Sequence, residues 1–310
     1  MTKILVTGGA GYIGSSLVPM LLEHKYKVRV LDCLLYGGAT LLPYFRNPNF
    51  DFIRGDIRNP LTVREALEGC DAVIHLAAIV GFPACRKNPD LAQTVNFDGT
   101  RIIADAVGRS RPVLFGSTGS NYGALEQEVC TEETPLNPLS LYGKTKTAAE
   151  QYLMEHCDTT AFRFATAFGV SPRIRLDLLI NEFVYNALKM RYLVVYESHF
   201  MRTFIHVQDM CRAFLFALQH NDKMRGQVYN CGSESMNFSK GQICDLIRKK
   251  VDYYLHYAEV GEDADKRNYV VSYKKLHALG YRTTVTVEEG IEELVRALQV
   301  VDVTNPYTNV

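Results

Sequence analysis

The sequence predicts an α/β protein, with a doubly wound parallel sheet followed by a smaller C-terminal α/β region. Three observations support this fold class. Short runs of Val, Ile, Leu and Phe alternate in the first half with longer stretches whose apolar residues recur every three or four positions. The short runs are apolar almost throughout, as strands are when helices cover both faces of a parallel sheet. The 310 residues suffice for one large domain or two modest ones with a full hydrophobic core.

Strands are expected where an apolar run is bounded by Gly, Asp or Pro. Six such runs lie in the first half, at residues 3–7, 27–31, 50–54, 72–76, 112–116 and 160–164. Four helices are expected between them, at residues 13–24, 60–68, 90–108 and 141–156. The first helix follows a glycine-rich turn, and the second has Asn59 as its predicted N-cap and Pro60 at its first position.

The alternation loosens after residue 164, where Arg and aromatic residues become frequent. Strand-like pieces remain at residues 192–196, 203–207 and 227–231, and helical pieces at residues 178–189, 208–219 and 240–251. No Pro/Ser-rich linker marks a boundary. We therefore predict one domain at residues 1–165 and a second at residues 166–310, with a segment at about 203–231 returning to the first.

Composition narrows the classes of function. The 34 Lys and Arg residues balance the 34 Asp and Glu residues at a pI of about 7.1, so we expect no nucleic-acid binding. No uncharged run reaches the roughly 18 residues of a membrane span, and no leader-like segment opens the chain, so we expect a cytoplasmic protein without membrane contact. The eight Cys residues are dispersed, which favours free thiols and no metal site.

A glycine-rich turn between the first strand and the first helix predicts a dinucleotide site. Gly8, Gly11 and Gly14 follow a GxxGxxG spacing, with Tyr12 and Ile13 between the last two. Glycines at this place let the backbone approach a pyrophosphate at the N-terminus of a helix.

The end of the second strand predicts which dinucleotide binds. Asp32 stands where a carboxylate can accept hydrogen bonds from the adenosine ribose hydroxyls. Because that carboxylate repels a 2′-phosphate and residues 33–39 contain no Arg, we expect NAD(H) rather than NADP(H). A turn residue at the end of a strand is the alternative reading of Asp32.

Two further strand ends extend the predicted cofactor site. Asp56 and Ile57 follow the third strand, and the Asp56 carboxylate can reach the adenine amino group. Leu76, Ala77 and Ala78 follow the fourth strand, and Ala77 and Ala78 are small enough to let the cofactor pass.

Tyr142 and Lys146 are the predicted catalytic pair. They form a Tyr-x₃-Lys motif at the start of a predicted helix, where the i, i+4 spacing places both on one face. A nearby ammonium group and a positive nicotinamide ring lower the pKa of a tyrosine, so that it can take a proton from a sugar hydroxyl. Thr118 follows the fifth strand and is expected to bind the reacting oxygen, with Ser117 and Ser120 as alternatives.

In chain order these motifs resemble the extended short-chain dehydrogenases/reductases that epimerise, dehydrate or oxidise nucleotide sugars. Residues 202–209 (RTFIHVQD) and 229–232 (YNCG) are similar to two downstream motifs of that family. The resemblance implies a Rossmann-type NAD-binding domain at residues 1–165 and a mainly substrate-binding domain at residues 166–310. It also implies that Arg202 and Arg267 bind the substrate diphosphate, that Thr166 and Asn181 contact substrate, and that the helices near 90–108 and 141–156 pair in a homodimer.

Departures from the family pattern bear on the reaction. Related 4,6-dehydratases have Asp-Glu after the catalytic Thr, whereas Gly119 and Ser120 follow Thr118 here. Thr166 replaces the usual sugar-contacting Asn. Residues 169–181 and 261–267 look most like bacterial GDP-heptose C4-dehydrogenases. We therefore expect oxidation at C4 of a GDP- or UDP-linked sugar, ending as dehydrogenation or epimerisation. Dehydration, oxidation of a substrate without a diphosphate, and a non-catalytic dinucleotide sensor are the alternatives.

Overall fold

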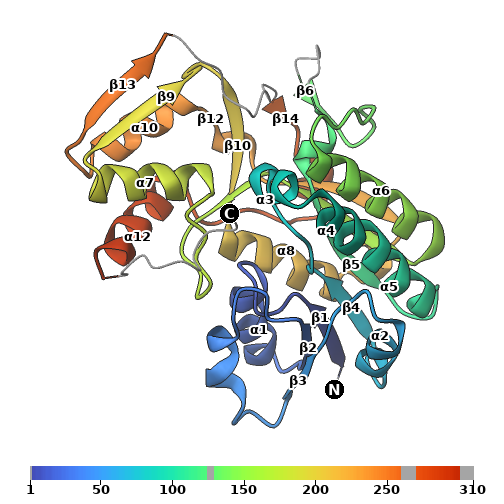
Figure 1. Ribbon diagram of the computed structural model, residues 1–310. Helices are drawn as coiled ribbons and strands as arrows, with labels where there is room; N and C mark the ends of the chain where they lie inside the picture. The colour runs from blue at the N-terminus through green and yellow to red at the C-terminus, as the bar shows by residue number, and fades with distance from the viewer. Residues whose placement is uncertain (1, 124–128, 260–269, 301–310) are drawn as a thin grey trace.

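The computed structural model describes residues 2–123, 129–259 and 270–300, and its centre is a seven-stranded parallel sheet (Figure 1). The strand order is β11-β7-β5-β4-β1-β2-β3. The bounds are β1 Lys3–Thr7, β2 Lys27–Asp32, β3 Phe50–Arg54, β4 Ala72–His75, β5 Val113–Thr118, β7 Thr159–Phe164 and β11 Gln227–Cys231. The order reverses between β1 and β4, the position at which doubly wound sheets open a crevice for ligands.

Helices cover both faces of this sheet, as its apolar strands require. The covering helices are α1 (Gly14–Glu23) and α8 (Val207–Gln219) on one face, and α2 (Pro60–Leu67), α5 (Thr100–Val107) and α6 (Leu141–His156) on the other (Figure 1). Successive β1 residues divide between the two cores, since Ile4 and Val6 pack with α1 while Leu5 packs toward α2 and α5. The predicted α/β class with a doubly wound parallel sheet is confirmed.

The expected helix at 90–108 is interrupted. The chain forms α3 (Phe82–Lys87), α4 (Pro89–Gln93), a π-helical turn (Thr94–Gly99) and then α5. The Asn96 side chain projects from that turn and bonds the backbone N–H and carbonyl of Ile79, at 2.7 and 3.0 Å. The wider turn therefore brings a buried amide to the segment after β4, which apolar spacing alone did not predict.

A second layer lies beyond the carboxyl ends of the large sheet. Its strands are β8 (Thr166–Phe168), β10 (Met201–His206) and β12 (Asn237–Ser239) in one sheet, with β9 (Tyr192–Tyr196) and β13 (Tyr254–Ala258) in another. Its helices are α7 (Leu179–Lys189), α10 (Lys240–Arg248) and α12 (Val287–Val300), and they enclose a separate core. The remaining elements are η1 (Ala39–Tyr44), η3 (Gly119–Asn121), β6 (Val129–Cys130), α9 (Asn221–Met224), η4 (Glu234–Met236), β14 (Val270–Val271) and α11 (Lys274–Ala278).

The chain passes between the two layers more than once. β8 and β10 pair in the second layer, whereas α8 and β11 return to the large sheet. Within the expected returning segment at 203–231, the residues up to His206 thus lie in the second layer and the later elements in the first.

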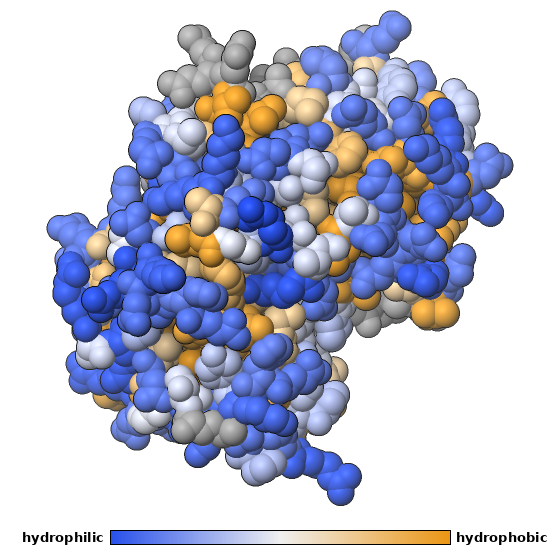
Figure 2. Space-filling model, turned by 180° about the vertical axis from the view of Figure 1, so that it is seen from behind, coloured by the Kyte–Doolittle hydropathy of each residue, from blue (hydrophilic) through white to orange (hydrophobic). Residues whose placement is uncertain are grey.

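The surface seen in Figure 2 is mostly hydrophilic, and the cysteines form no disulfides. On this face apolar residues appear in separate patches (Figure 2). All eight thiols are free; Cys33 is exposed and the other seven are buried. Among the described residues, no helix combines the length and apolarity that a membrane crossing requires.

Candidate active site

A cavity of about 1130 Å³ lies at the carboxyl ends of the parallel strands, between the two layers. The large sheet contributes the residues that follow β1 and β4 and the last residues of β2 and β5. The second layer contributes the opposite wall, from the chain after β8 and from α7, β9 and β10. The cavity therefore occupies the crevice expected at the reversal of strand order.

The glycine turn forms one end of the cavity, which is lined by Gly8, Gly11, Tyr12, Ile13 and Gly14. Gly8 has a φ of +73°, and a Cβ atom there would stand 2.7 Å from the backbone nitrogen of Ala77. The Gly11 N–H donates to the Gly8 carbonyl at 3.1 Å, which closes the turn just before α1 begins. The absence of side chains leaves a cradle at the positive end of the helix dipole.

Asp32 lies at the end of β2 and lines the cavity beside this turn. Its carboxylate accepts hydrogen bonds from the backbone N–H groups of Ala10 at 3.0 Å and Leu34 at 2.7 Å. Burial raises the pKa of Asp32, and these two hydrogen bonds oppose the increase. The same carboxylate thus fixes the glycine turn and presents a negative edge to the cavity.

Asp56 also lines the cavity, and it is paired with a cation that the sequence analysis did not single out. The Arg58 guanidinium lies 2.6 Å from the Asp56 carboxylate and 3.3 Å from the Thr94 hydroxyl. The hydrogen bond from Arg58 lowers the pKa of Asp56. Ile57, Leu76, Ala77 and Ala78 line the cavity as well.

Tyr142 and Lys146 both line the cavity from the first turns of α6. The Ser140 hydroxyl caps this helix by accepting from the Gly143 N–H at 3.1 Å. Lys146 is 3% exposed, and its Nζ lies 3.9 Å from the centre of the Phe115 ring. Burial lowers the pKa of Lys146 to about 7. Its charge is therefore sensitive to what occupies the cavity.

Thr118 ends β5 and lines the cavity, as do the two alternatives, Ser117 and Ser120. The Thr118 hydroxyl accepts from the Ser120 N–H at 3.1 Å, which leaves its own proton available to donate. The Ser117 hydroxyl donates instead to the Glu150 carboxylate at 2.5 Å, so it is engaged on the side of α6. Of these two hydroxyls, that of Thr118 is the better placed to donate to a ligand oxygen.

Glu150 joins the two elements that carry the predicted catalytic residues. Its carboxylate also accepts from the Asn121 amide at 3.1 Å and pairs with Arg163 of β7 at 2.7 Å. Glu150 is 2% exposed, and the Arg163 side chain 6%. The sequence analysis missed this network, although a carboxylate two turns after Tyr142 and an Arg inside an apolar strand signal a buried ion pair.

The second wall contains some of the predicted substrate residues. Thr166 and Arg202 line the cavity, the latter 3% exposed. Asn181 does not line it, because its amide is buried and bonds the backbone of Gly169 and Arg175. Arg267 lies outside the described residues.

The loop at residues 169–177, which we call the arginine loop, adds side chains that the sequence analysis did not assign. Arg173, Arg175 and Asp177 line the cavity. Arg175 and Asp177 form an ion pair at 2.5 Å, with their side chains 9% and 10% exposed. Arginines in a loop between β8 and α7 follow no periodicity that would reveal their orientation.

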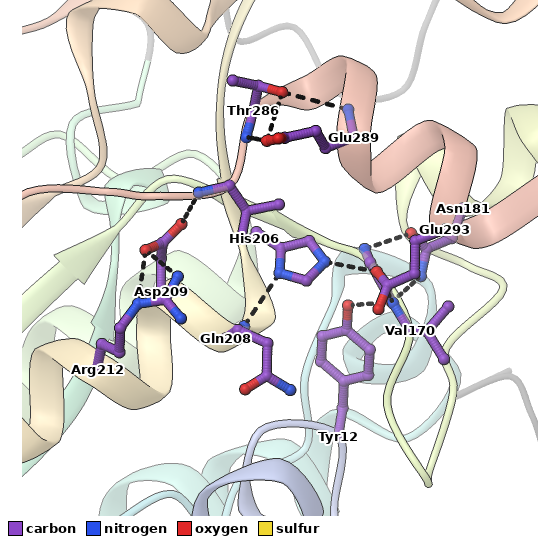
Figure 3. A network of polar contacts seen from close by, with 12 residues as sticks. Tyr12, Val170, Asn181, His206, Gln208, Asp209, Arg212, Thr286, Glu289 and Glu293 are labelled. Carbon is purple, nitrogen blue, oxygen red and sulfur yellow. Dashed lines mark hydrogen bonds and ion pairs between the residues drawn. The ribbon is translucent and has the colours of Figure 1, made fainter. Parts of the chain in front are cut away.

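Side chains from segments far apart in the sequence hold this loop in place (Figure 3). The Tyr12 phenol donates to the Gly169 carbonyl at 2.8 Å, and the Asn181 carbonyl accepts from the Gly169 N–H at 3.0 Å. The Glu293 carboxylate of α12 bonds both the Val170 N–H and the His206 ring. The glycine turn, α7 and α12 thus meet at this loop. Within residues 2–123, 129–259 and 270–300, no cluster of His, Cys, Asp and Glu suited to a metal ion occurs.

Comparison with known proteins finds similarity along most of the chain. Residues 4–232 match the model of the NAD-dependent epimerase/dehydratase family. The low-salt glycan biosynthesis protein Agl12 of Haloferax volcanii is 30% identical, over 94% of this chain and 97% of its own.

Solved structures are similar over nearly the whole chain. The dTDP-glucose 4,6-dehydratase DesIV of Streptomyces venezuelae, a double mutant with NAD bound, has a TM-score of 0.85 and 27% identity, covering 96% of this chain and 97% of its own. The UDP-glucuronic acid 4-epimerase of Bacillus cereus, with UDP-glucuronic acid and NAD, has a TM-score of 0.85 and 27% identity, covering 96% and 99%. These proteins share one fold and carry out different reactions.

Proposed function

We propose that this chain, which belongs to the NAD-dependent epimerase/dehydratase family and thus to the extended short-chain dehydrogenases/reductases, oxidises C4 of a nucleotide-diphosphate sugar. The observation that carries the proposal is a single cavity that joins the glycine turn, Thr118, Tyr142 and Lys146, while Gly119 and Ser120 supply no carboxylate after Thr118. The net reaction is then 4-dehydrogenation, or 4-epimerisation through a 4-keto intermediate.

The cofactor is NAD, and the cavity fits it. At Gly8 and Gly14 a Cβ atom would clash with neighbouring backbone, so the tight turn that forms the cradle requires glycine there. The Asp32 carboxylate stands beside this cradle for the ribose hydroxyls. Bound NAD⁺ supplies the hydride acceptor. Because Asp32 has no cation among the residues that bond it, we expect NADP⁺ to bind more weakly. Titration of the full chain with both cofactors measures this difference, and equal affinities would place Asp32 elsewhere than at the ribose.

Residues of the chain then take the proton from the substrate hydroxyl. The Tyr142 phenolate accepts the proton of the C4 hydroxyl, and the Thr118 hydroxyl donates a hydrogen bond that fixes the reacting oxygen. Protonated Lys146 stabilises the phenolate. Burial lowers the pKa of Lys146 to about 7, so part of its population is protonated at neutral pH. That protonated fraction rises when an anion forms beside it.

Arg202 stands in the second wall, where we propose that it binds the substrate diphosphate through bidentate hydrogen bonds. Arg267 keeps its diphosphate role only as a sequence-based prediction, because it lies outside the described residues. Asn181, predicted to contact the substrate, does not line the cavity. We further propose a homodimer that pairs through α5 and α6, which light scattering of the purified protein tests directly. A monomer would contradict it.

Dehydration is the second candidate, because a solved dTDP-glucose 4,6-dehydratase is among the similar structures. It requires an acid and a base near C5 and C6 of the sugar. Among the described residues, the carboxylates that line the cavity are Asp32, Asp56, Asp177 and Glu182. Asp32 and Asp56 lie at the cofactor end, and Asp177 is paired with Arg175.

Product masses separate these reactions. We would incubate the full chain with NAD⁺ and a panel of GDP-, UDP- and dTDP-linked sugars, with Tyr142→Phe as the inactive control. Unchanged mass with a changed sugar indicates epimerisation, and a loss of two hydrogens indicates oxidation. Loss of one water would overturn the proposal, and Glu182→Gln would then test the remaining carboxylate.

A further inference from the structure

The arginine loop is fixed to the first turn of α1. The Ser171 hydroxyl donates to the Tyr12 carbonyl at 2.6 Å and lies 2.9 Å from the Ser15 hydroxyl. The Arg173 N–H donates to that same Ser15 hydroxyl at 3.3 Å. With the Tyr12 phenol bonded to Gly169, the loop has four polar contacts to Tyr12 in the glycine turn and to Ser15 in α1. A segment of the second layer is therefore part of the cofactor end of the cavity.

The Arg173 side chain extends from this loop along the cavity wall. It lines the cavity and is 4% exposed. Its guanidinium carbon lies 4.2 Å from the centre of the Tyr36 ring, and Tyr36 stands four residues after Asp32 in the chain that follows β2. Arg173 thus contacts both elements that flank the predicted pyrophosphate position, α1 through its backbone and the segment after β2 through its guanidinium.

The charges around Arg173 favour an anion there. Asp177 is the acidic side chain of this loop, and it is paired with Arg175. Burial, together with the positive charge of Arg175, lowers the pKa of Arg173. Two buried guanidinium groups therefore share one carboxylate on this loop. A bound anion that pairs with the Arg173 guanidinium would reduce the cost of burying its charge.

We propose that Arg173 binds the pyrophosphate of the dinucleotide cofactor, so that the cofactor is held by the second layer as well as by the glycine turn. The proposal rests on the proposed use of the glycine turn as the NAD site. The N-terminus of α1 offers backbone N–H groups to the phosphates, and the planar guanidinium, oriented by the Tyr36 ring, offers paired donors. Cofactor binding then ties the arginine loop to the first layer.

Affinities for cofactor fragments test the assignment. We would strip bound nucleotide from the full chain and titrate NAD⁺, ADP and adenosine by calorimetry. For Arg173→Ala we expect ~10–100-fold weaker binding of NAD⁺ and ADP, from the loss of charged hydrogen bonds, and unchanged binding of adenosine. Arg173→Lys keeps the charge without the planar donors and should fall between the two. Arg64→Ala removes an exposed arginine of α2 that lies outside the cavity, and it should leave ADP affinity unchanged.

The outcomes are distinguishable. If the unaltered chain binds neither NAD⁺ nor ADP, the proposed function fails. If it binds both and Arg173→Ala binds ADP as tightly, only the assignment of Arg173 fails. Equal loss of adenosine and ADP in Arg173→Ala would also overturn it, because the residue would then support the fold of the site rather than the pyrophosphate. Should Arg173→Ala not fold, Arg173→Lys and Arg173→Gln are judged by the ratio of ADP to adenosine affinity.

Discussion

The two walls of the cavity carry their functional side chains in different ways. On the wall of the large sheet, the predicted residues stand at or just beyond the end of a strand or in the first turns of a helix, as Asp32 and Tyr142 do. On the opposite wall, Arg173 and Arg175 project from a loop that polar contacts hold against α1, α7 and α12. The first wall is ordered by local structure and the second by contacts between distant segments.

This difference separates two tasks. We expect the large-sheet wall to move the proton, because Tyr142, Lys146 and Thr118 all belong to it. We expect the second wall to hold anionic groups, since Arg173, Arg175 and Arg202 belong to it and their side chains are buried. Substitutions on the two walls should therefore change different kinetic constants.

The largest expected effect is on turnover. Tyr142→Phe removes the transferable proton and little else, so kcat should fall ~10²–10⁴-fold while affinity for NAD⁺ stays within a few-fold. Steady-state kinetics and cofactor titration measure the two quantities. Tyr257→Phe, which changes an exposed phenol in the second layer, is the control and should leave both unchanged.

Arg202→Ala gives the opposite signature for the second wall. Loss of a buried charged contact to the substrate should raise KM, with a cost of about 2–5 kcal/mol in substrate binding, and should spare cofactor affinity. A variant that lost only kcat would contradict the division of tasks between the walls.

The same difference between the walls explains which structural features the sequence could predict. The parallel strands, the glycine turn and the Tyr-x₃-Lys pair depend on local spacing, and the structure places all of them at the cavity. Asn181 was expected at the substrate because of its motif, yet its amide is used by the backbone of the arginine loop. The π-helical turn likewise depends on the bonds of Asn96 to Ile79, 17 residues earlier, which apolar periodicity does not encode.

Glu150→Gln tests whether the large-sheet wall depends on its buried ion pair. Removing one partner of such a pair leaves Arg163 buried without its counterion, so the free energy of unfolding should fall by about 3–5 kcal/mol. Denaturant unfolding measures this loss. Glu155→Gln on the exposed side of the same helix is the matched control, with an expected change within about 0.5 kcal/mol. Similar losses in both variants would mean that the network does not brace this wall.

Gly8→Ala tests the crowding of the glycine turn against a control with the same backbone conformation. Gly8 and Gly69 have φ values of +73° and +68°, but a Cβ atom at Gly69 would meet nothing within 4 Å. The left-handed backbone alone should cost ~1–2 kcal/mol in each variant. Gly8→Ala should lose more than this, together with NAD⁺ affinity, because its Cβ atom meets the backbone of Ala77. Equal stability of the two variants would show that the turn can relax.

The smallest expected effect concerns the charge of Lys146 and its dependence on pH. In the folded chain burial lowers the pKa of Lys146 from 10.5 to about 7, so between these values the unfolded chain binds a proton that the folded chain does not. Stability contributed by this residue should therefore rise as pH increases above 7, by at most about 1.4 kcal/mol per pH unit. Below pH 7 both states are protonated, and the cost of the buried charge is fully present. Lys146→Met should remove this slope, whereas Lys144→Met, on the exposed face of α6, should retain it. Denaturant unfolding between pH 6.5 and pH 7.5 measures the slope below the pH range in which the cysteines titrate in the unfolded chain. A slope that persists in Lys146→Met would mean that Lys146 keeps its charge in the folded protein throughout this range, and the ammonium would then stabilise the Tyr142 phenolate without the help of a bound anion.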